Sequence, residues 1–161
     1  MPQQRFTPEP PLLTVRVRLP GAGPRRGQGV WRERELAANQ TLEDLGEAMP
    51  LAFGFTDPHL WACFLSGKAW DRTTAYALRP SASLFGGSRG RAAGRTLLRD
   101  VPYPGPDGKG AFLYLFDFGD EWRFRVKLGR VTPTLTPGER YPRIVVSQGV
   151  APPQYADIEE E

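Results

Sequence analysis

The most constraining feature of the sequence is the stretch FLYLFDFGDEWRFRVKL at residues 112–128, in which two apolar runs flank a short acidic corner. In the second run the alternation is strict, with Trp122, Phe124, Val126 and Leu128 on one side and Arg123, Arg125 and Lys127 on the other. This two-residue period is typical of a β-strand that packs on one face and meets water on the other. A glycine and an aspartate between two such runs favour a tight turn, so the stretch predicts a β-hairpin central to the core.

Further strands are predicted on both sides of this hairpin. Residues 13–19 alternate in the same way, and residues 30–37 resume extended structure after a Gly- and Pro-rich loop, which predicts a first hairpin. Residues 58–70 predict another strand pair, with its turn near Ser66 and Gly67. The remaining extended segments are short and lie at residues 97–98 and 144–146.

One amphipathic helix is predicted after the first hairpin. Its apolar residues recur at three- and four-residue steps, at Leu42, Leu45, Ala48, Met49, Ala52 and Phe53. Thr41 and Asp44 have the spacing of an N-terminal capping pair, and Gly54 suits the left-handed position that ends a helix. Pro50 cannot donate a backbone hydrogen bond, so we expect a kink or an early end near it. These elements predict an α+β fold, with a mostly antiparallel sheet packed on one main helix in a single compact domain.

The length and composition of the chain are those of one domain. It has 161 residues, of which 40% are hydrophobic, and this is enough to form a core. Cys63 is the only cysteine, so neither an intramolecular disulfide nor a multi-cysteine zinc site can form. No apolar run has the length of a signal peptide or of a membrane span. We therefore expect a cytoplasmic protein with no membrane association.

The ends of the chain differ in character from its centre. We predict a mobile segment at residues 1–11, a folded domain at 12–150, and a Pro-rich, acidic tail at 151–161. The net charge is +3, and the last five residues hold four carboxylates, so the remainder carries +3 plus 4, or +7. A basic body favours nucleic acid as a partner. However, 18 of the 21 basic residues are arginine, and its GC-rich codons offer an alternative explanation that involves no ligand.

The acidic corner holds three carboxylates within five residues, at Asp117, Asp120 and Glu121. With His59, the only histidine, they form a candidate polar site. One interpretation is structural, because an aspartate beside Gly119 accepts hydrogen bonds from backbone amides and closes a turn. Trp122 would then lock the hairpin, with its ring in the core and an acceptor for its indole N–H. The alternative is a divalent-cation site in a metal-dependent carboxylate enzyme.

Other catalytic arrangements find little support in the sequence. A serine triad could be built only around His59, and no Gly-x-Ser-x-Gly motif supplies the nucleophile. A zinc site that combined His59 with Cys63 would lack a recognisable ligand spacing. The sequence therefore predicts no metal and no cofactor. The structural interpretation of His59 is that it begins a strand, with its ring partly exposed or bonded to nearby backbone.

Two basic regions are candidate contacts for phosphate groups, and they supply Arg89, Arg91, Arg95, Arg123 and Arg125. The first three belong to the loop at residues 84–95, which matches no nucleotide-binding motif. The other two lie on the predicted strand face, which could join Arg16 and Arg18 in a cationic surface. Weak, sequence-independent binding of nucleic acid is one interpretation. A solvated surface is the other, because the aromatic residues of that strand are predicted on its opposite face.

The order of three features is specific enough to suggest a family. Residues 116–122 read FDFGDEW, and the chain ends with the segment QGVAPPQY before its acidic tail. The helix and the segment after it supply Thr41, Leu42, Leu45, Ala52, Phe53, Gly54, His59, Leu60 and Phe64. Over nearly the whole chain this pattern resembles the plasmid pRiA4b ORF-3-like family, whose hallmark is Tyr-Asp-Phe-Gly-Asp-x-Trp.

The sequence departs from that family at two points. Phe124 stands where the family commonly has histidine, which weakens a metal or acid-base role for the corner, and the Gly-rich C-terminal segment is reduced. The resemblance implies a compact α+β fold, and some members resemble accessory genes carried with plasmids and insertion elements. The leading hypothesis is a non-catalytic binding or accessory module associated with plasmid or mobile DNA. The alternative is the metal-dependent enzyme centred on the corner.

Overall fold

The structure is a computed structural model that describes residues 11–21, 29–78 and 91–155. These residues form an eight-stranded sheet with the order β5-β4-β3-β6-β7-β1-β2-β8. The strands are β1 (Leu12–Leu19), β2 (Val30–Ala37), β3 (Trp61–Phe64), β4 (Ala75–Ala77), β5 (Arg91–Ala92), β6 (Phe112–Phe116), β7 (Trp122–Thr132) and β8 (Arg143–Gln148). Neighbouring strands are antiparallel except β4 and β5, which are parallel.

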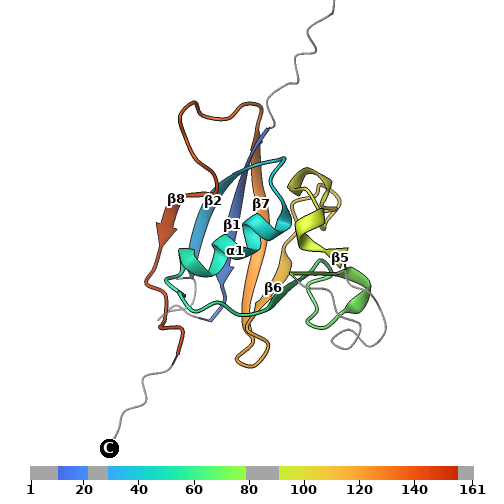
Figure 1. The fold of residues 1–161 in the computed structure, drawn as a ribbon, viewed down its shortest axis with the longest axis vertical. Coiled ribbons are helices and arrows are strands. Elements are labelled where there is room, and N and C mark those ends of the chain that lie inside the picture. Colours follow the sequence, from blue (N-terminus) through green and yellow to red (C-terminus); the bar gives the residue numbers. More distant parts are fainter. Residues whose placement is uncertain (1–10, 22–28, 79–90, 156–161) are drawn as a thin grey trace, which may run out of the picture.

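The helix α1 (Leu42–Ala52) lies across one face of the sheet, in front of β1 and β7 in Figure 1. The predicted capping pair is confirmed, because the Thr41 side chain accepts a hydrogen bond from the Asp44 amide and the Asp44 carboxylate accepts one from the Thr41 amide. Gly54 has a φ of 78°, the left-handed conformation predicted after the helix. No helix in the described part of the chain is long and apolar enough to cross a membrane. Together the helix and sheet confirm the predicted α+β class.

The two faces of the sheet have different environments. The face toward α1, called the inner face below, contributes to the main core, which includes Leu45, Trp61, Tyr114 and Phe124. On the opposite, outer face, a smaller buried cluster covers β3, β4 and β6 and consists of Ala62, Phe64, Ala75, Ala77, Leu113 and Leu115. The outer face of β7 and β1 carries charged side chains instead. The outer face is therefore apolar and buried over β3, β4 and β6, and charged over β7 and β1.

The central hairpin of the prediction is confirmed. Strands β6 and β7 pair in antiparallel register from Phe112 opposite Val126 to Phe116 opposite Trp122, and they lie in the middle of the sheet (Figure 1). The first hairpin is also confirmed, since β1 pairs with β2 along all eight residues.

Residues 58–70 differ from the strand pair that the sequence predicts. Only β3 forms within them, and its partner β4 begins after the 3-10 helix η1 (Arg72–Thr74). Gly67 and Trp70 have φ values of 81° and 65°, a left-handed conformation that interrupts a strand. Further along, the extended piece predicted at residues 97–98 is reduced to one isolated bridge between Leu97 and Thr41. Two other 3-10 helices flank that bridge, η2 (Ala93–Arg95) and η3 (Leu98–Asp100).

Candidate functional site

Asp117 closes the turn between β6 and β7. Its carboxylate oxygen Oδ1 accepts hydrogen bonds from the backbone amides of Gly119 and Asp120, at 3.1 Å and 3.3 Å. The Glu121 amide donates to the Asp117 carbonyl oxygen, and Asp117 itself has a φ of 64°. Aspartate tolerates this left-handed conformation better than most residues because its short side chain bonds to nearby backbone. The geometry is that of a turn whose first carboxylate is occupied by backbone donors.

The other two carboxylates of the corner differ, since Glu121 has hydrogen-bond partners and Asp120 has none among the described residues. Oε1 of Glu121 accepts from the Trp70 indole nitrogen at 3.3 Å and from Arg123 at 3.1 Å. The Asp120 carboxylate accepts no hydrogen bond from any described residue. Within the described part of the chain, no three histidine, cysteine, aspartate or glutamate side chains form a group that could hold a metal ion. The corner therefore provides no converging oxygen ligands for the metal-enzyme alternative.

His59 lies in the loop before β3 and contacts two distant side chains. Its Nε2 is 2.7 Å from the hydroxyl oxygen of Tyr155 and 3.4 Å from Oδ2 of Asp117. Its ring also meets Phe116 edge-on, with 5.7 Å between ring centroids. The structure thus corrects the expectation that His59 begins a strand, because β3 starts two residues later, at Trp61. The ring is partly exposed, as expected, and its hydrogen-bond partners are side chains instead of nearby backbone.

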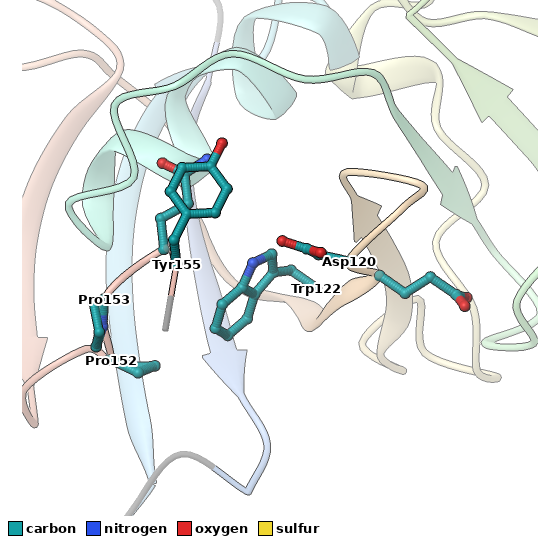
Figure 2. Close-up of a pocket in the computed structure, with 7 residues that line it drawn as sticks. Asp120, Trp122, Pro152, Pro153 and Tyr155 are labelled. Carbon is teal, nitrogen blue, oxygen red and sulfur yellow. The ribbon is translucent and has the colours of Figure 1, made fainter. Parts of the chain in front are cut away.

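The C-terminal segment packs against this loop and forms one wall of a pocket. The side-chain amide of Gln154 accepts from the Asp57 amide at 3.1 Å and donates to the Asp57 carbonyl oxygen at 3.0 Å. Desolvation and the neighbouring Asp57 carboxylate raise the pKa of the Tyr155 hydroxyl. An open pocket of about 720 Å³ lies between this segment and the corner, and its lining includes Asp120, Trp122, Pro152, Pro153 and Tyr155 (Figure 2).

Trp122 differs from its prediction in two respects, the burial of its ring and the partner of its indole N–H. Its ring packs on Phe55, with centroids 4.8 Å apart, but the residue is only partly buried. The indole nitrogen is itself buried and has no hydrogen-bond partner among the described residues. The predicted acceptor is therefore missing. The Asp117 and Glu121 carboxylates are used by backbone amides, Trp70 and Arg123, and the Asp120 carboxylate makes no hydrogen bond with the indole nitrogen. Figure 2 shows the Trp122 nitrogen on the side of the ring that faces Asp120 and Tyr155.

A second candidate site is a basic groove on the outer face of the sheet. Arg16 lies directly opposite Lys127, and Arg18 lies directly opposite Arg125, across the β1–β7 pair. These four side chains and Lys109 line a groove of about 430 Å³, which we call the cationic groove. Among the four strand residues, Arg16 has a described acidic partner, Glu33, at 2.7 Å. Arg125 donates to the Gly67 carbonyl oxygen at 3.0 Å.

The structure separates the arginines that the sequence analysis grouped as phosphate contacts. Arg125 lies in the cationic groove, whereas Arg123 is paired with Glu121 nearer the corner. Arg91 is on β5, where it donates to the Thr73 carbonyl oxygen and lies over the Tyr76 ring of the inner face. Arg95 is exposed at the end of η2, and Arg89 lies outside the described residues.

The sequence analysis did not identify three residues of these sites as candidate functional residues. Tyr155 and Lys109 lie in segments without periodicity, so no local pattern pointed to them. Trp31 lies opposite Arg18 and therefore shares the outer face, where the guanidinium of Arg16 covers its ring at 4.0 Å. The alternation of β2 could have placed Trp31, since it lies one residue from the buried Val30.

The fold and the turn define an α+β protein in which one capped helix covers a mostly antiparallel sheet and an Asp-Phe-Gly-Asp corner closes the central hairpin. The chain belongs to the plasmid pRiA4b ORF-3-like protein family, whose model matches residues 12–159. Its structure is similar to the crystal structure of MM3350, a protein of unknown function from Methanosarcina mazei Go1. The two share 22% identity at a TM-score of 0.68, over 89% of this chain and 72% of the other, which shows the fold alone. No curated protein matches the sequence.

Proposed function

We propose that this protein is a non-catalytic binding module of the cytoplasm whose cationic groove binds the phosphate backbone of nucleic acid. The observation that supports it most is the placement of Arg16 opposite Lys127 and of Arg18 opposite Arg125. Like charges directly opposite each other on neighbouring strands repel and reduce stability. An anion bound between the two strands would offset this repulsion, which gives the arrangement a physical reason.

The charge balance of the groove supports an anionic ligand. Of its four strand cations, only Arg16 forms an ion pair with a described residue. The Glu33 carboxylate that neutralises Arg16 lies directly opposite it on β2, which neighbours β1 on the side that does not face β7. Arg18, Arg125 and Lys127 therefore keep their positive charge, and neighbouring phosphates of a nucleic acid would match cations spaced along two strands.

Contacts to phosphates, and not to bases, should dominate this binding. Trp31 is the aromatic residue beside the groove, but the Arg16 guanidinium lies over its ring. A base can stack on Trp31 only if Arg16 moves away, whereas phosphates can approach the basic side chains directly. We therefore expect weak binding that ignores sequence and falls steeply with salt. The family takes its description from a plasmid open reading frame, and on that basis alone we extend the proposal to an accessory role associated with plasmid or other mobile DNA.

The test is a titration of fluorescein-labelled single- and double-stranded DNA of random sequence, followed by anisotropy at several salt concentrations. A plot of log affinity against log salt should have a slope of about −3 to −4. The double variant Arg18→Gln/Arg125→Gln should weaken binding and reduce the magnitude of the slope by about 2.

The matched control is the double variant Arg99→Gln/Arg140→Gln. It removes the same charge from two exposed arginines outside the groove. Equal losses in the two double variants would show that net charge, not the groove, is responsible. Salt-resistant or sequence-selective binding by the wild-type protein would contradict the proposed mode.

A further inference from the structure

The pocket beside Trp122 continues into a second hollow. The second hollow has a volume of about 460 Å³ and is lined in part by Leu19, Pro20 and Gly21. Both hollows share Trp122, Glu121 and Pro152, so the tryptophan lies between them. Two adjoining open hollows suit an extended chain, whose side chains enter successive depressions, better than one compact small molecule.

The indole N–H of Trp122 supplies a reason for a ligand with a hydrogen-bond acceptor. Its nitrogen is buried and has no partner among the described residues. A buried donor without an acceptor is rare, and each case calls for an explanation. Figure 2 shows the exposed Asp120 and Tyr155 on the side of the ring that carries this nitrogen. A peptide carbonyl oxygen can accept this hydrogen bond once one of those two side chains moves.

The charges around the pocket identify the complementary charge of the ligand. Asp120 lines the pocket and forms no hydrogen bond or ion pair with a described residue. Desolvation is the largest cause that raises the pKa of the Tyr155 hydroxyl, and the nearby carboxylates of Asp57, Asp117 and Asp120 raise it further. The Glu121 carboxylate is offset by Arg123. Carboxylates beside two aromatic rings favour a cation, because a ring face attracts positive charge.

We infer that the groove formed by the two hollows binds an extended, proline-containing basic segment of a partner protein. Such a segment keeps its backbone carbonyl groups free, so one of them can accept the Trp122 N–H. Proline rings pack on Trp122 and Tyr155, and an arginine or lysine lies beside Asp120. This site is on a different part of the molecule from the cationic groove and does not depend on its function.

The test uses a short, capped peptide of repeated Arg-Pro-Pro, followed by calorimetry and by the intrinsic tryptophan fluorescence of the protein. We expect a Kd on the order of 100 μM. Matched peptides replace arginine with glutamate, or proline with glycine, and both should bind at least several-fold more weakly. Trp122→Phe, which keeps an aromatic ring on Phe55 but removes the N–H, should weaken binding about 3- to 10-fold.

A second variant tests the same site and leaves Trp122 in place, so its result does not depend on whether Trp122→Phe folds normally. Asp120→Asn removes an exposed charge and should weaken the Arg-Pro-Pro peptide about 2- to 5-fold, whereas Asp100→Asn, an exposed aspartate on η3, should change nothing. The variant Arg18→Gln/Arg125→Gln should bind the peptide normally, which separates this site from the cationic groove.

No binding at about 1 mM peptide, or equal binding of the glutamate peptide, overturns the inference. So does a loss of stability in Asp120→Asn without any peptide effect, because Asp120 would then be the internal acceptor of Trp122.

Discussion

The hydroxyl oxygen of Tyr155 lies 2.7 Å from Nε2 of His59, and this contact joins the C-terminal segment to the loop before β3. The same nitrogen is 3.4 Å from Oδ2 of Asp117, whose other oxygen holds the turn between β6 and β7. Three segments that are far apart in the chain therefore meet at one imidazole ring. The pocket wall depends on this contact, because Tyr155 itself lines the pocket.

The first prediction concerns that contact. Tyr155→Phe removes the hydroxyl but keeps the ring, so unfolding in urea should show only a small loss of stability, since Tyr155 is exposed. His59→Ala should cost more, because it also removes the contact with Asp117. In a double-mutant cycle the two changes should couple, and strictly additive losses would show that the hydrogen bond does not form in solution.

The second prediction concerns the turn at Asp117. Asp117→Ala should reduce the free energy of unfolding by about 2 to 3 kcal/mol, because two backbone amides lose their acceptor and alanine disfavours the left-handed conformation. Asp117→Asn keeps an acceptor oxygen and tolerates that conformation, so it should cost less than about 1 kcal/mol. Urea unfolding of the two variants measures the difference.

Two variants of the same corner, Asp117→Asn and Asp120→Asn, test the alternative that it binds a divalent cation. Calorimetry with Mg²⁺, Mn²⁺ and Ca²⁺ should detect no micromolar binding to the native protein, because the corner carboxylates do not converge. Micromolar binding that either Asp117→Asn or Asp120→Asn abolishes, with unchanged folding stability, would instead identify the corner as a cation site.

The third prediction uses two leucines of α1. Leu45 is fully buried, whereas Leu51 is 62% exposed. Leu45→Ala should reduce the free energy of unfolding by about 2 to 5 kcal/mol, through the lost transfer energy and the cavity that remains. Leu51→Ala makes the same chemical change on the same helix and should alter stability by less than about 0.5 kcal/mol. Equal melting temperatures for the two variants would contradict the burial of this helix face.

The fourth prediction concerns a glycine within the same helix. Alanine normally stabilises a helix relative to glycine by about 1 kcal/mol. At Gly46, however, an added Cβ would lie 2.3 Å from carbons of the buried Trp61 ring, so Gly46→Ala should destabilise the protein by about 1 to 3 kcal/mol. Thermal unfolding measures this loss. In a Trp61→Phe background, where the clashing ring carbons are absent, the alanine should cost much less.

The fifth prediction concerns Cys63, which is fully buried. A thiol reagent should modify it slowly in the native protein and rapidly in urea. Burial raises the pKa of its thiol above the ordinary value of 9.0. The folded state therefore holds this proton more tightly than the unfolded state, so the contribution to stability is complete below pH 9.0 and is lost as the pH rises above it.

The control for this pH dependence is the variant Cys63→Ala. Between about pH 8 and pH 10, the stability of the wild-type protein should fall more than that of the variant, by up to about 1.4 kcal/mol for each pH unit above the ordinary thiol pKa. Burial is also the main cause that raises the pKa of the Tyr103 and Tyr114 hydroxyls, and both proteins share it, so this part of their effect cancels. The smaller contribution of Cys63 to these two shifts is lost in the variant and belongs to the measured difference. Parallel stability curves would show that the thiol does not titrate differently in the two states.

The local pattern of apolar and polar residues in the sequence was sufficient to predict much of this fold. The alternation in β1 and β7 identified their buried and charged sides, and the spacing of Thr41 and Asp44 located the start of α1. The aspartate-glycine corner likewise indicated a turn closed by its own carboxylate. Such features depend on residues a few positions apart, whose side-chain directions follow from the period of a strand or helix.

Tertiary packing decided the features that matter most for binding. The pairing of Arg16 with Lys127 requires the register between β1 and β7, which packing of the inner face selects. The strand at residues 75–77 forms because β3 offers it an edge, although its own sequence is too short to predict it. His59 and Tyr155 lie 96 residues apart and come together only because the C-terminal segment folds back on the loop before β3. No local propensity encodes such a contact, since it arises from the packing of segments whose sequences show no common period.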